Sequence, residues 1–485
     1  MADKRRQYTH ILHLRAARIA LAAGIALLTL SAARSAQAQT FAVLQNLGAT
    51  EGANPYAGLT QATDGNLYGT AFNGGIGYGT LFKITPSGAL TALYTFCSQS
   101  GCTDGQNPVA GLVQATNGNL YGTTESGGAS SAGTVFKITS TGTLTTLYSF
   151  CSQAGCPDGQ FPLASLVQGI DGNLYGTTFF GGGIVDAGTI FKITPSGALT
   201  TLYSFCSQSV CTDGSDPSGL VQSTDGNFYG TTREGGLNDY GTVFRITPTG
   251  TLTTLHSFGS QSTDGIYPYA GLVQATDGNF YGTTYVGGGN SSGTVFRIKP
   301  NGTLTTLYAF CSQSGCTDGQ GPGAGLVQAT DGSLYGTTVY GGANLDGTVF
   351  KVTPTGTLTT LHSFEGTDGD FPMSALVQGT DGNLYGTTTG GGASGGGTVF
   401  SLSMGLAPFV ETQPTLGPVG IPVKILGTNL TGATSVTFNG TPAVFTVFSS
   451  SLIGAKVPAG ATTGTVQVVT PSGTLSSNVP FRVRQ

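Results

Sequence analysis

The stretch Gly271–Thr284, GLVQATDGNFYGTT, decides the fold because variants of it recur along most of the chain. Its centre reads DGNLYGT, DGNFYGT, NGNLYGT or DGSLYGT at seven places. The tyrosines of the seven copies lie 50 to 54 residues apart, at Tyr68, Tyr121, Tyr175, Tyr229, Tyr281, Tyr335 and Tyr385. Self-similarity at a fixed period of this length indicates a repeat architecture.

Each repeat contains four short runs of Leu, Val, Phe, Tyr, Ile and Thr, which are typical of β-strands. An Asp-Gly or Asn-Gly pair, the preferred centre of a tight hairpin turn, separates the first run from the second. A TPSG-like turn separates the third run from the fourth. Seven repeats of four antiparallel strands predict an all-β fold with a seven-bladed β-propeller.

The two ends of the repeat array are complementary. The last repeat stops after GTVFSLS, at Ser403, without its fourth run, and FAVLQNL at residues 41–47 matches that missing run. A solenoid, the alternative architecture, would end in capping repeats instead. We therefore expect Phe41 to Leu47 to complete the seventh blade and close the ring, which removes open sheet edges.

The order GLVQATDGNLYGTT, GTVFKITPSG, LTTLYSF resembles the GloVer choice-of-anchor tandem repeat family of exported bacterial proteins. It is also similar to the propeller units of the streptogramin lyase and NHL types. The likeness covers roughly Phe41 to Met404 and implies export, often with a variable C-terminal anchor, but no known activity. We expect the propeller at residues 39–404. The lyase site is not carried over, because no histidine lies in an insert.

Residues 405–485 follow a Pro-rich join and no longer carry the repeat. Their segments ILGTNL, VTFNGTPA and VPAGATTGTVQVVTPSG resemble the IPT/TIG immunoglobulin-like family. The resemblance implies a small β-sandwich that serves as a spacer or interaction domain and carries no catalytic residues.

The first 38 residues have the pattern of a secretory signal peptide, with basic residues, an apolar run from Ile19 to Leu30, and small residues at Ala36 and Ala38. The apolar run is too short to span a membrane. Cleavage after Ala38 leaves 12 basic and 22 acidic residues, a formal charge of −10. The mature chain is therefore expected to be secreted, periplasmic or at the cell surface, without membrane insertion or nucleic-acid binding.

Alternating strand directions place the Asp-Gly turns on one face of the propeller and the variable glycine-rich inserts on the other. Function concentrates in loops on a rigid scaffold, so we expect ligand binding on the insert face or at the channel mouth. Arg233 and Glu234 form the only adjacent charge pair in the inserts, and nearby tyrosines can stack on sugars or peptides or pack between blades. The predicted ligand-binding residues are Arg233, Glu234, Tyr240, Tyr285 and Tyr340.

The eight cysteines form four C-x4-C pairs: Cys97 and Cys102, Cys151 and Cys156, Cys206 and Cys211, and Cys311 and Cys316. Repeats that lack one member of a pair lack both, which favours local disulfides. A zinc site would need ligands from two blades, and redox chemistry would need CxxC spacing. We predict four loop disulfides and no metal at these cysteines.

A second acidic series precedes glycine in six loops of the insert face, at Asp104, Asp158, Asp213, Asp264, Asp318 and Asp368. Polar turns are the preferred interpretation of this series and of the Asp-Gly motif. Calcium ligation is the alternative, and no other cofactor is predicted. His256 and His362 replace the tyrosine of LTTLYSF, where a place on the strand surface is expected.

The sequence predicts no catalytic residue. It favours an exported binding or structural protein of the bacterial envelope or exterior, with carbohydrate or surface-protein partners on the variable face. An exported lyase or glycan-acting hydrolase, with its site at the channel mouth, is the alternative.

Overall fold

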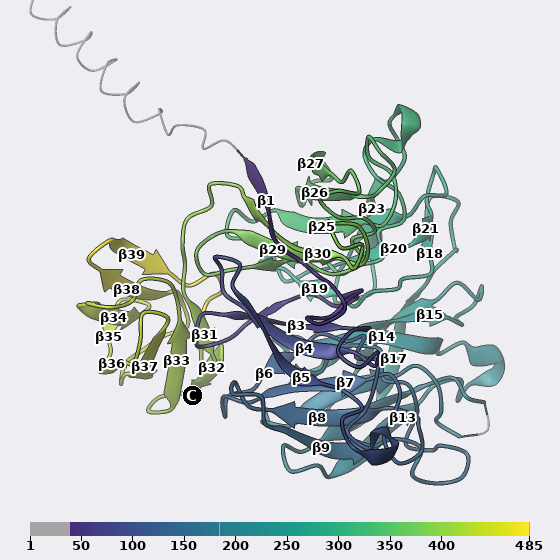
Figure 1. The fold of residues 1–485 in the computed structure, drawn as a ribbon, viewed down its shortest axis with the longest axis horizontal. Helices are drawn as coiled ribbons and strands as arrows, with labels where there is room; N and C mark the ends of the chain where they lie inside the picture. The colour runs from purple at the N-terminus through teal and green to yellow at the C-terminus, as the bar shows by residue number, and fades with distance from the viewer. Residues whose placement is uncertain (1–38, 184, 485) are drawn as a thin grey trace, which may run out of the picture.

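A computed structural model describes residues 39–183 and 185–484, so the expected signal segment, residues 1–38, lies outside the described residues. In this part of the chain, seven four-stranded antiparallel sheets precede a C-terminal β-sandwich (Figure 1). The sheets are the blades of a propeller, as the repeats predict. Among the described residues, no helix has the length and apolar character needed to cross a membrane.

The blades are numbered along the chain, each from its inner to its outer strand. Blade 1 comprises β2 (Thr60–Gln61), β3 (Leu67–Ala71), β4 (Thr80–Ile84) and β5 (Leu90–Thr95); blade 2 comprises β6 (Val113–Gln114), β7 (Leu120–Thr124), β8 (Thr134–Ile138) and β9 (Leu144–Ser149). Blade 3 comprises β10 (Val167–Gln168), β11 (Leu174–Thr178), β12 (Thr189–Ile193) and β13 (Leu199–Ser204); blade 4 comprises β14 (Ser215–Gln222), β15 (Phe228–Glu234), β16 (Thr242–Ile246) and β17 (Leu252–Ser257).

Blade 5 comprises β19 (Val273–Gln274), β20 (Phe280–Thr284), β22 (Thr294–Ile298) and β23 (Leu304–Ala309), beside the small pair β18 (Gly265–Ile266) and β21 (Val286–Gly287). Blade 6 comprises β24 (Val327–Gln328), β25 (Leu334–Thr338), β26 (Thr348–Val352) and β27 (Leu358–Ser363); blade 7 comprises β28 (Val377–Gln378), β29 (Leu384–Thr388), β30 (Thr398–Ser403) and β1 (Thr40–Asn46). Short 3-10 turns occur at η1 (Ser100–Cys102), η2 (Ser209–Cys211) and η3 (Ser314–Cys316).

The N-terminal strand closes the ring. Strand β1 pairs antiparallel with β30, with Phe41 opposite Leu402 and a bulge between Val43 and Gln45. Figure 1 shows β1, in purple, lying against the green strands of blade 7. Strand β1, Thr40–Asn46, thus occupies the place of the fourth strand of blade 7, where the segment from Phe41 to Leu47 was expected.

The repeated DGNLYGT motif builds the packing within and between blades. Its tyrosines are buried, and Tyr281 donates its hydroxyl to Asp277 of the Asp-Gly turn at 2.8 Å. Burial and the Asp277 carboxylate together raise the pKa of Tyr281 to about 12. In blade 2, Asn117 keeps the contact because its amide donates to the Tyr121 hydroxyl at 2.8 Å. The first residue of the motif thus has two roles: it forms the turn, and its side chain hydrogen-bonds the motif tyrosine.

The motif glycine also has a packing role. A Cβ added at this glycine in any blade would lie 2.5–2.7 Å from the tip of the phenylalanine ring on the next strand, as at Gly282 and Phe296. A real Cβ essentially never comes so close to another heavy atom, so the ring occupies the space that a side chain would need. The repeated spacing of glycine and phenylalanine thus lets neighbouring strands pack tightly.

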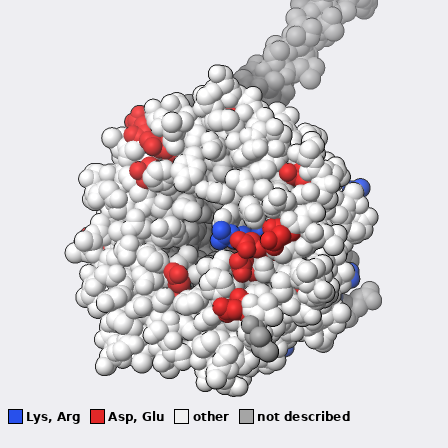
Figure 2. All heavy atoms as spheres, turned by 90° about the vertical axis from the view of Figure 1, so that its right-hand side faces the viewer, with Lys and Arg blue, Asp and Glu red and all other residues white. Residues whose placement is uncertain are grey.

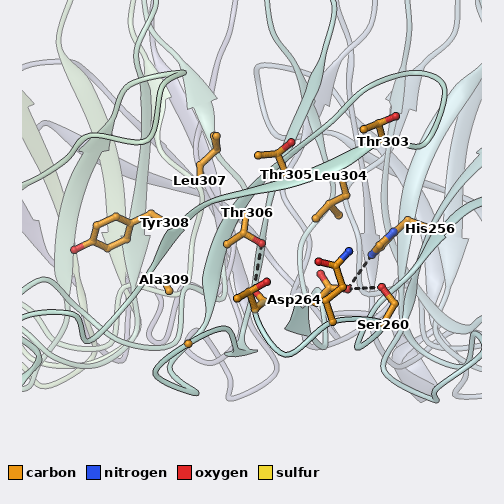
Figure 3. Close-up of a pocket in the computed structure, with 13 residues that line it drawn as sticks. His256, Ser260, Asp264, Thr303, Leu304, Thr305, Thr306, Leu307, Tyr308 and Ala309 are labelled. Carbon is orange, nitrogen blue, oxygen red and sulfur yellow. Dashed lines mark hydrogen bonds and ion pairs between the residues drawn. The ribbon is translucent and has the colours of Figure 1, made fainter.

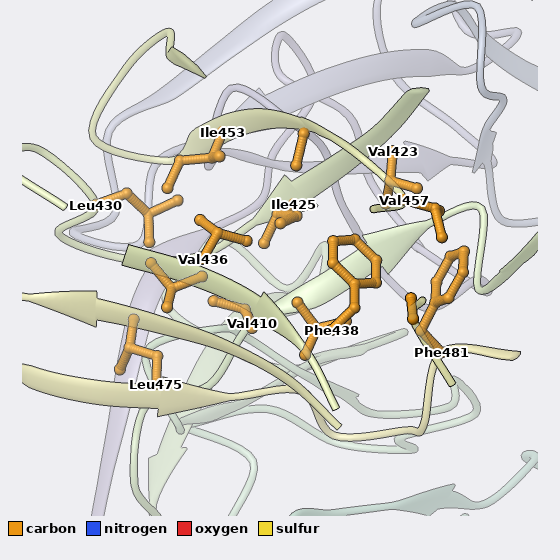
Figure 4. Close-up of a cluster of buried hydrophobic side chains, with 14 residues drawn as sticks. Val410, Val423, Ile425, Leu430, Val436, Phe438, Ile453, Val457, Leu475 and Phe481 are labelled. Carbon is orange, nitrogen blue, oxygen red and sulfur yellow. The ribbon is translucent and has the colours of Figure 1, made fainter. Parts of the chain in front are cut away.

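The C-terminal domain, residues 410–484, is a sandwich. One sheet comprises β31 (Glu411–Gln413), β33 (Pro422–Leu426), β37 (Leu452–Lys456) and β36 (Phe445–Val447); the other comprises β35 (Thr441–Pro442), β34 (Ser435–Phe438), β38 (Val466–Thr470) and β39 (Gly473–Ser476). Strands β32 (Leu416–Pro418) and β40 (Arg482–Arg484) pair in parallel. Aliphatic side chains of both sheets meet the rings of Phe438 and Phe481, which pack edge to face at 5.1 Å (Figure 4).

This domain sits on the Asp-Gly face of the propeller. In blades 1, 2, 4 and 7 it contacts the threonine that precedes the Asp-Gly or Asn-Gly turn. The contacts are Ser451 Oγ to the Thr63 carbonyl (3.0 Å), Lys424 Nζ to the Thr116 carbonyl (2.9 Å), Arg482 to the Thr224 carbonyl (3.1 Å) and Thr428 Oγ1 with Thr380 Oγ1 (2.8 Å). Because blade 4 lies across the ring from blades 7 and 1, the domain spans the propeller axis on this face.

Candidate functional site at the insert-face channel mouth

The variable inserts and the cysteine loops meet on the face opposite the C-terminal domain. The loops are joined by backbone hydrogen bonds, for example from Gly128 to the Cys102 carbonyl and from Gly182 to the Cys156 carbonyl, both at 2.9 Å. Figure 2 shows this face with a hollow at its centre, where a basic group lies beside several acidic residues. Arg233 is the only Lys or Arg of the seven inserts.

An unusual backbone conformation precedes each inner strand on this face. The residue before the strand-leading proline has a φ of 51° to 64° in all seven repeats: Asn54, Asn107, Phe161, Asp216, Tyr267, Gly321 and Phe371. Asn, Asp and Gly tolerate the left-handed region, whereas an aromatic residue there costs about 1–3 kcal/mol. Such strain concentrates at functional sites, and here it holds three aromatic side chains on the insert face.

Arg233 lies between aromatic rings of the two neighbouring blades. Its guanidinium carbon is 4.5 Å from the ring centre of Tyr269 and 6.0 Å from that of Phe179. Its Nε lies 3.9 Å from Glu234 and, within the described residues, is buried without a hydrogen-bond partner. Arginine stacked on aromatic rings is attracted by their negative faces. Arg233 therefore joins blades 3, 4 and 5 at the mouth.

Carboxylates crowd around this arginine. Burial raises the pKa of Asp216 to about 6, and the negative charges of Glu234, Asp186 and Asp239 add to the rise while Arg233 opposes it. A carboxyl group with a pKa in this range exchanges its proton near neutral pH. Arg233 and Glu234 were predicted from the sequence, whereas Asp216 was not. Its available signal was its place before the inner-strand proline, a position shared by all repeats.

The three predicted tyrosines all lie on this face, in blades 4, 5 and 6. The Tyr285 ring packs against that of Tyr269 at 4.8 Å, and burial and the nearby Tyr340 raise the pKa of Tyr285 to about 12. Tyr340 in turn packs edge to face on Phe371 at 5.6 Å. Arg233 and Tyr285 thus share one neighbour, Tyr269, which was not among the predicted ligand-binding residues.

The remaining predicted tyrosine, Tyr240, packs edge to face on Tyr267 at 5.7 Å. Its ring also lies against Gly259, where an added Cβ would come within 2.3 Å of it. Tyr240 is therefore tied to the loop that follows blade 4. Tyr240 and Tyr340 pack against neighbouring rings and also remain accessible to solvent. Their exposed fractions are 37% and 42%.

The second acidic series braces the loops of the insert face. Asp104 is fully buried and accepts hydrogen bonds from the Tyr94 hydroxyl at 2.8 Å and from the backbone and hydroxyl of Ser98, both at 2.9 Å. A calcium ion would have to displace these donors. In the residues that the structure describes, no group of three or more His, Cys, Asp or Glu side chains is arranged to hold a metal ion.

All four predicted disulfides are present, and they close the loops that contain these aspartates. In the two loops without cysteines, the tyrosine partner is replaced by histidine. His256 Nε2 lies 3.0 Å from Asp264, and His362 Nε2 lies 2.7 Å from Asp368. The two histidines therefore hold the loop aspartates as the tyrosines do in the other loops. From the sequence, the histidines were expected only to lie on the strand surface.

The family model described as Gloeobacter/Verrucomicrobia repeat matches residues 33–212 and 207–400. The chain belongs to this repeat family. The IPT/TIG domain model matches residues 410–483 of this Gloeobacter/Verrucomicrobia repeat protein. No curated protein matches it.

Among solved structures, a fungal alcohol oxidase of the AA5 family in complex with copper matches with a TM-score of 0.50 at 14% identity, covering 92% of this chain and 99% of that one. A gluconolactonase from Xanthomonas campestris matches with a TM-score of 0.39 at 12% identity, covering 77% and 92% of the two chains. A luciferin-regenerating enzyme matches with a TM-score of 0.40 at 11% identity, covering 77% and 98%. At such identities a match shows the fold alone, because one fold hosts many functions.

The insert-face mouth of the Gloeobacter/Verrucomicrobia repeat protein combines features of a binding site. It presents aromatic rings in several orientations, a guanidinium group with an unused donor and carboxyl groups of different pKa. Apolar surfaces with a few converging polar groups are typical of ligand sites. Burial of Asp216, with the negative charge of Glu234 adding to its effect, raises the pKa of this carboxyl group to about 6.

Proposed function

We propose that the protein is an exported, non-catalytic binding protein of the bacterial envelope or exterior that receives a polysaccharide at the insert-face mouth of its propeller. The observation that carries the proposal is the placement of Arg233 between Phe179 and Tyr269, within a rim of partly exposed aromatic rings. Flat apolar faces of sugar rings stack on aromatic rings, while guanidinium and carboxylate groups bond their hydroxyls.

The position of the C-terminal domain supports this choice of face. The C-terminal domain spans the propeller axis over the Asp-Gly turns and stands in the way on that face. A polysaccharide therefore reaches the channel from the insert face. The loops of that side also vary between repeats while the Asp-Gly turns hardly vary. Variable side chains on a constant scaffold are suited to recognising one ligand among many.

Export is supported by the composition of the chain. The first 38 residues have the pattern of a cleavable signal. Four disulfides favour an oxidising compartment, where such bonds persist.

The experiment is binding of residues 39–485 to an array of microbial and plant polysaccharides, with and without a chelator. We expect selective binding that is at least tenfold weaker in an R233A/Y269A double variant. Arg245→Ala is the matched control, because Arg245 lies on β16 and bonds Thr253 instead of the mouth residues. Binding that is equally strong in R233A/Y269A would overturn the assignment to the mouth, and absence of binding to every polysaccharide would overturn the ligand class.

A second candidate function is an exported glycan-acting lyase or hydrolase at the same mouth. The specific observation in its favour is the raised pKa of Asp216, since glycan-cleaving enzymes use one carboxyl group as a general acid near neutral pH. The test is release of oligosaccharides from any polysaccharide that the protein binds. Turnover that rises below pH 7 and is lost in Asp216→Asn would support the enzyme and contradict the non-catalytic proposal.

A further inference from the structure

A cavity of about 810 Å³ opens on the flank of the propeller, between the outer strands of blades 4 and 5 (Figure 3). Residues 303–309, which include the whole of β23, form one wall. His256, together with Ser260, Thr263 and Asp264 of the loop after β17, forms the other. The cavity is therefore separate from the Arg233 mouth and independent of the function proposed above.

The cavity arises where the repeat is shortened. In the disulfide-closed loops, such as that from Tyr308 to Asp318, the bracing pair is ten residues apart, whereas His256 and Asp264 are eight apart. The short loop has no cysteines and no 3-10 turn. Histidine is also smaller than the tyrosine that it replaces. Both changes remove atoms from this part of the flank.

The orientation of the His256 ring is fixed from two sides. Its Nε2 is held by Asp264 Oδ2 at 3.0 Å, and its ring stands edge to face against Phe258 at 5.1 Å with an interplanar angle of 82°. The side chain is 17% exposed. A ring fixed in this way presents a preorganised face, which lowers the entropic cost of stacking.

The chain itself shows what stacks on such a histidine. His362 has the same setting, with Asp368 at 2.7 Å and Phe364 edge to face at 4.9 Å. Its face is covered by the ring of Phe41, parallel within 5° at 3.7 Å. Phe41 lies opposite Leu402 on β30, and the register of blade 5 places Leu304 at the corresponding point, opposite Ile298. Leu304, beside His256, therefore has the strand position that Phe41 has beside His362. His256 thus has an aliphatic neighbour at the point where His362 has an aromatic ring.

The other lining groups select the chemistry of the occupant. Hydroxyl groups of Ser260, Thr303, Thr305 and Thr306 line the cavity, and among its described lining residues no Lys or Arg is present. Asp264 Oδ1 is buried and has no hydrogen-bond partner in the described part of the chain. In three of the disulfide-closed loops the corresponding Oδ1, of Asp104, Asp213 and Asp318, accepts from a backbone amide, whereas that of Asp158 has no partner among the described residues either. The cavity thus combines one flat platform, a row of hydroxyls and an acceptor with spare capacity.

We propose that this cavity is a second binding site, for a neutral pyranose unit of a saccharide. The flat face of the sugar stacks on His256, and its hydroxyls bond the threonines of β23 and the Asp264 carboxylate. Anionic ligands are disfavoured because the cavity supplies no basic group other than His256, which is already paired. Purely apolar ligands are disfavoured because they would take the hydroxyl groups of the cavity out of water and offer them no hydrogen-bond partner.

The test uses residues 39–485 with 13C-labelled histidine, which contain two histidines, His256 and His362. Cellotetraose, maltotetraose and mannotetraose are titrated in turn to 10 mM while the ring signals are recorded. We expect at least one tetrasaccharide to shift the His256 signals saturably and to leave His362, which Phe41 covers, unchanged. No shift with all three saccharides, or equal shifts of both histidines, would overturn the proposal.

Two variants locate the effect. His256→Ala removes the platform and is expected to weaken saccharide binding at least tenfold by calorimetry. His362→Ala is the matched control, since it loses an equivalent aspartate pair and is expected to keep the affinity. Equal loss in both variants would point to general loosening and overturn the site. The R233A/Y269A variant is expected to keep the His256 shift, so failure of the mouth proposal and failure of this one are distinguishable.

Discussion

Truncation of the ring-closing aromatic residue, Phe41→Ala, is expected to destabilise blade 7 by about 3 kcal/mol. Complete truncation of a buried phenylalanine costs about 3–5 kcal/mol, and Phe41 is only partly buried, which favours the lower end. Its ring contacts those of His362 at 3.7 Å, Phe400 at 5.3 Å and Phe364 at 5.8 Å. Aromatic pairs of this kind add about 0.5–1.5 kcal/mol each to plain area burial.

The assay is urea denaturation combined with amide hydrogen exchange. The loss is expected to appear first as faster exchange in β1 and β30, because Phe41 holds these paired strands against blade 6. Phe448→Ala is the control, since this ring is 66% exposed and surface substitutions usually stay within about 0.5 kcal/mol. A loss below about 1 kcal/mol, or exchange that rises equally in all blades, would refute the view that Phe41 fastens the ring.

Two further predictions concern the repeat motif. Gly282→Ala places a Cβ 2.6 Å from the Phe296 ring and is expected to cost about 2 kcal/mol in thermal denaturation, whereas Gly289→Ala, with nothing within 4 Å, is the near-neutral control; equal melting temperatures would contradict it. Burial alone would raise the pKa of Asp171, but hydrogen bonds, including one from Lys192, lower it to about 2. A lowered carboxyl pKa stabilises the fold above the unfolded value of about 3.9, and this contribution is lost as pH falls towards 2. Lys192→Met is therefore expected to lower the melting temperature at pH 7 but hardly at pH 2, and an equal decrease at both would argue against the pairing.

The repetition in the sequence was sufficient to predict the propeller fold. Seven copies of one hairpin signal specify seven equivalent sheets, and the complementary ends predicted the pairing of the Phe41 strand with β30. The disulfides were predictable for the same reason, because cysteines that are kept or lost in pairs within one loop have a partner at hand.

Features that depend on differences between blades were not predictable in the same way. The C-terminal domain contacts the threonine before the turn in four blades, although an equivalent residue stands in the others. At the mouth, the contact of Arg233 with Tyr269 joins residues of different blades, and repeat alignment gives only their equivalent positions. The raised pKa of Asp216 likewise depends on burial and on acidic residues of two different inserts, Glu234 and Asp239 in blade 4 and Asp186 in blade 3.

The pairing of β1 with β30 also has a consequence for biogenesis. Strand β1 is synthesised first but can pair only after its partner β30 has been synthesised. Six blades can therefore assemble as an open arc before the ring is completed. During that interval β30 offers an unpaired edge that any copy of β1 fits equally well, including one from another molecule. We therefore expect crowded refolding to yield strand-exchanged dimers, each molecule lending its first strand to the other, and dilution to restore monomers.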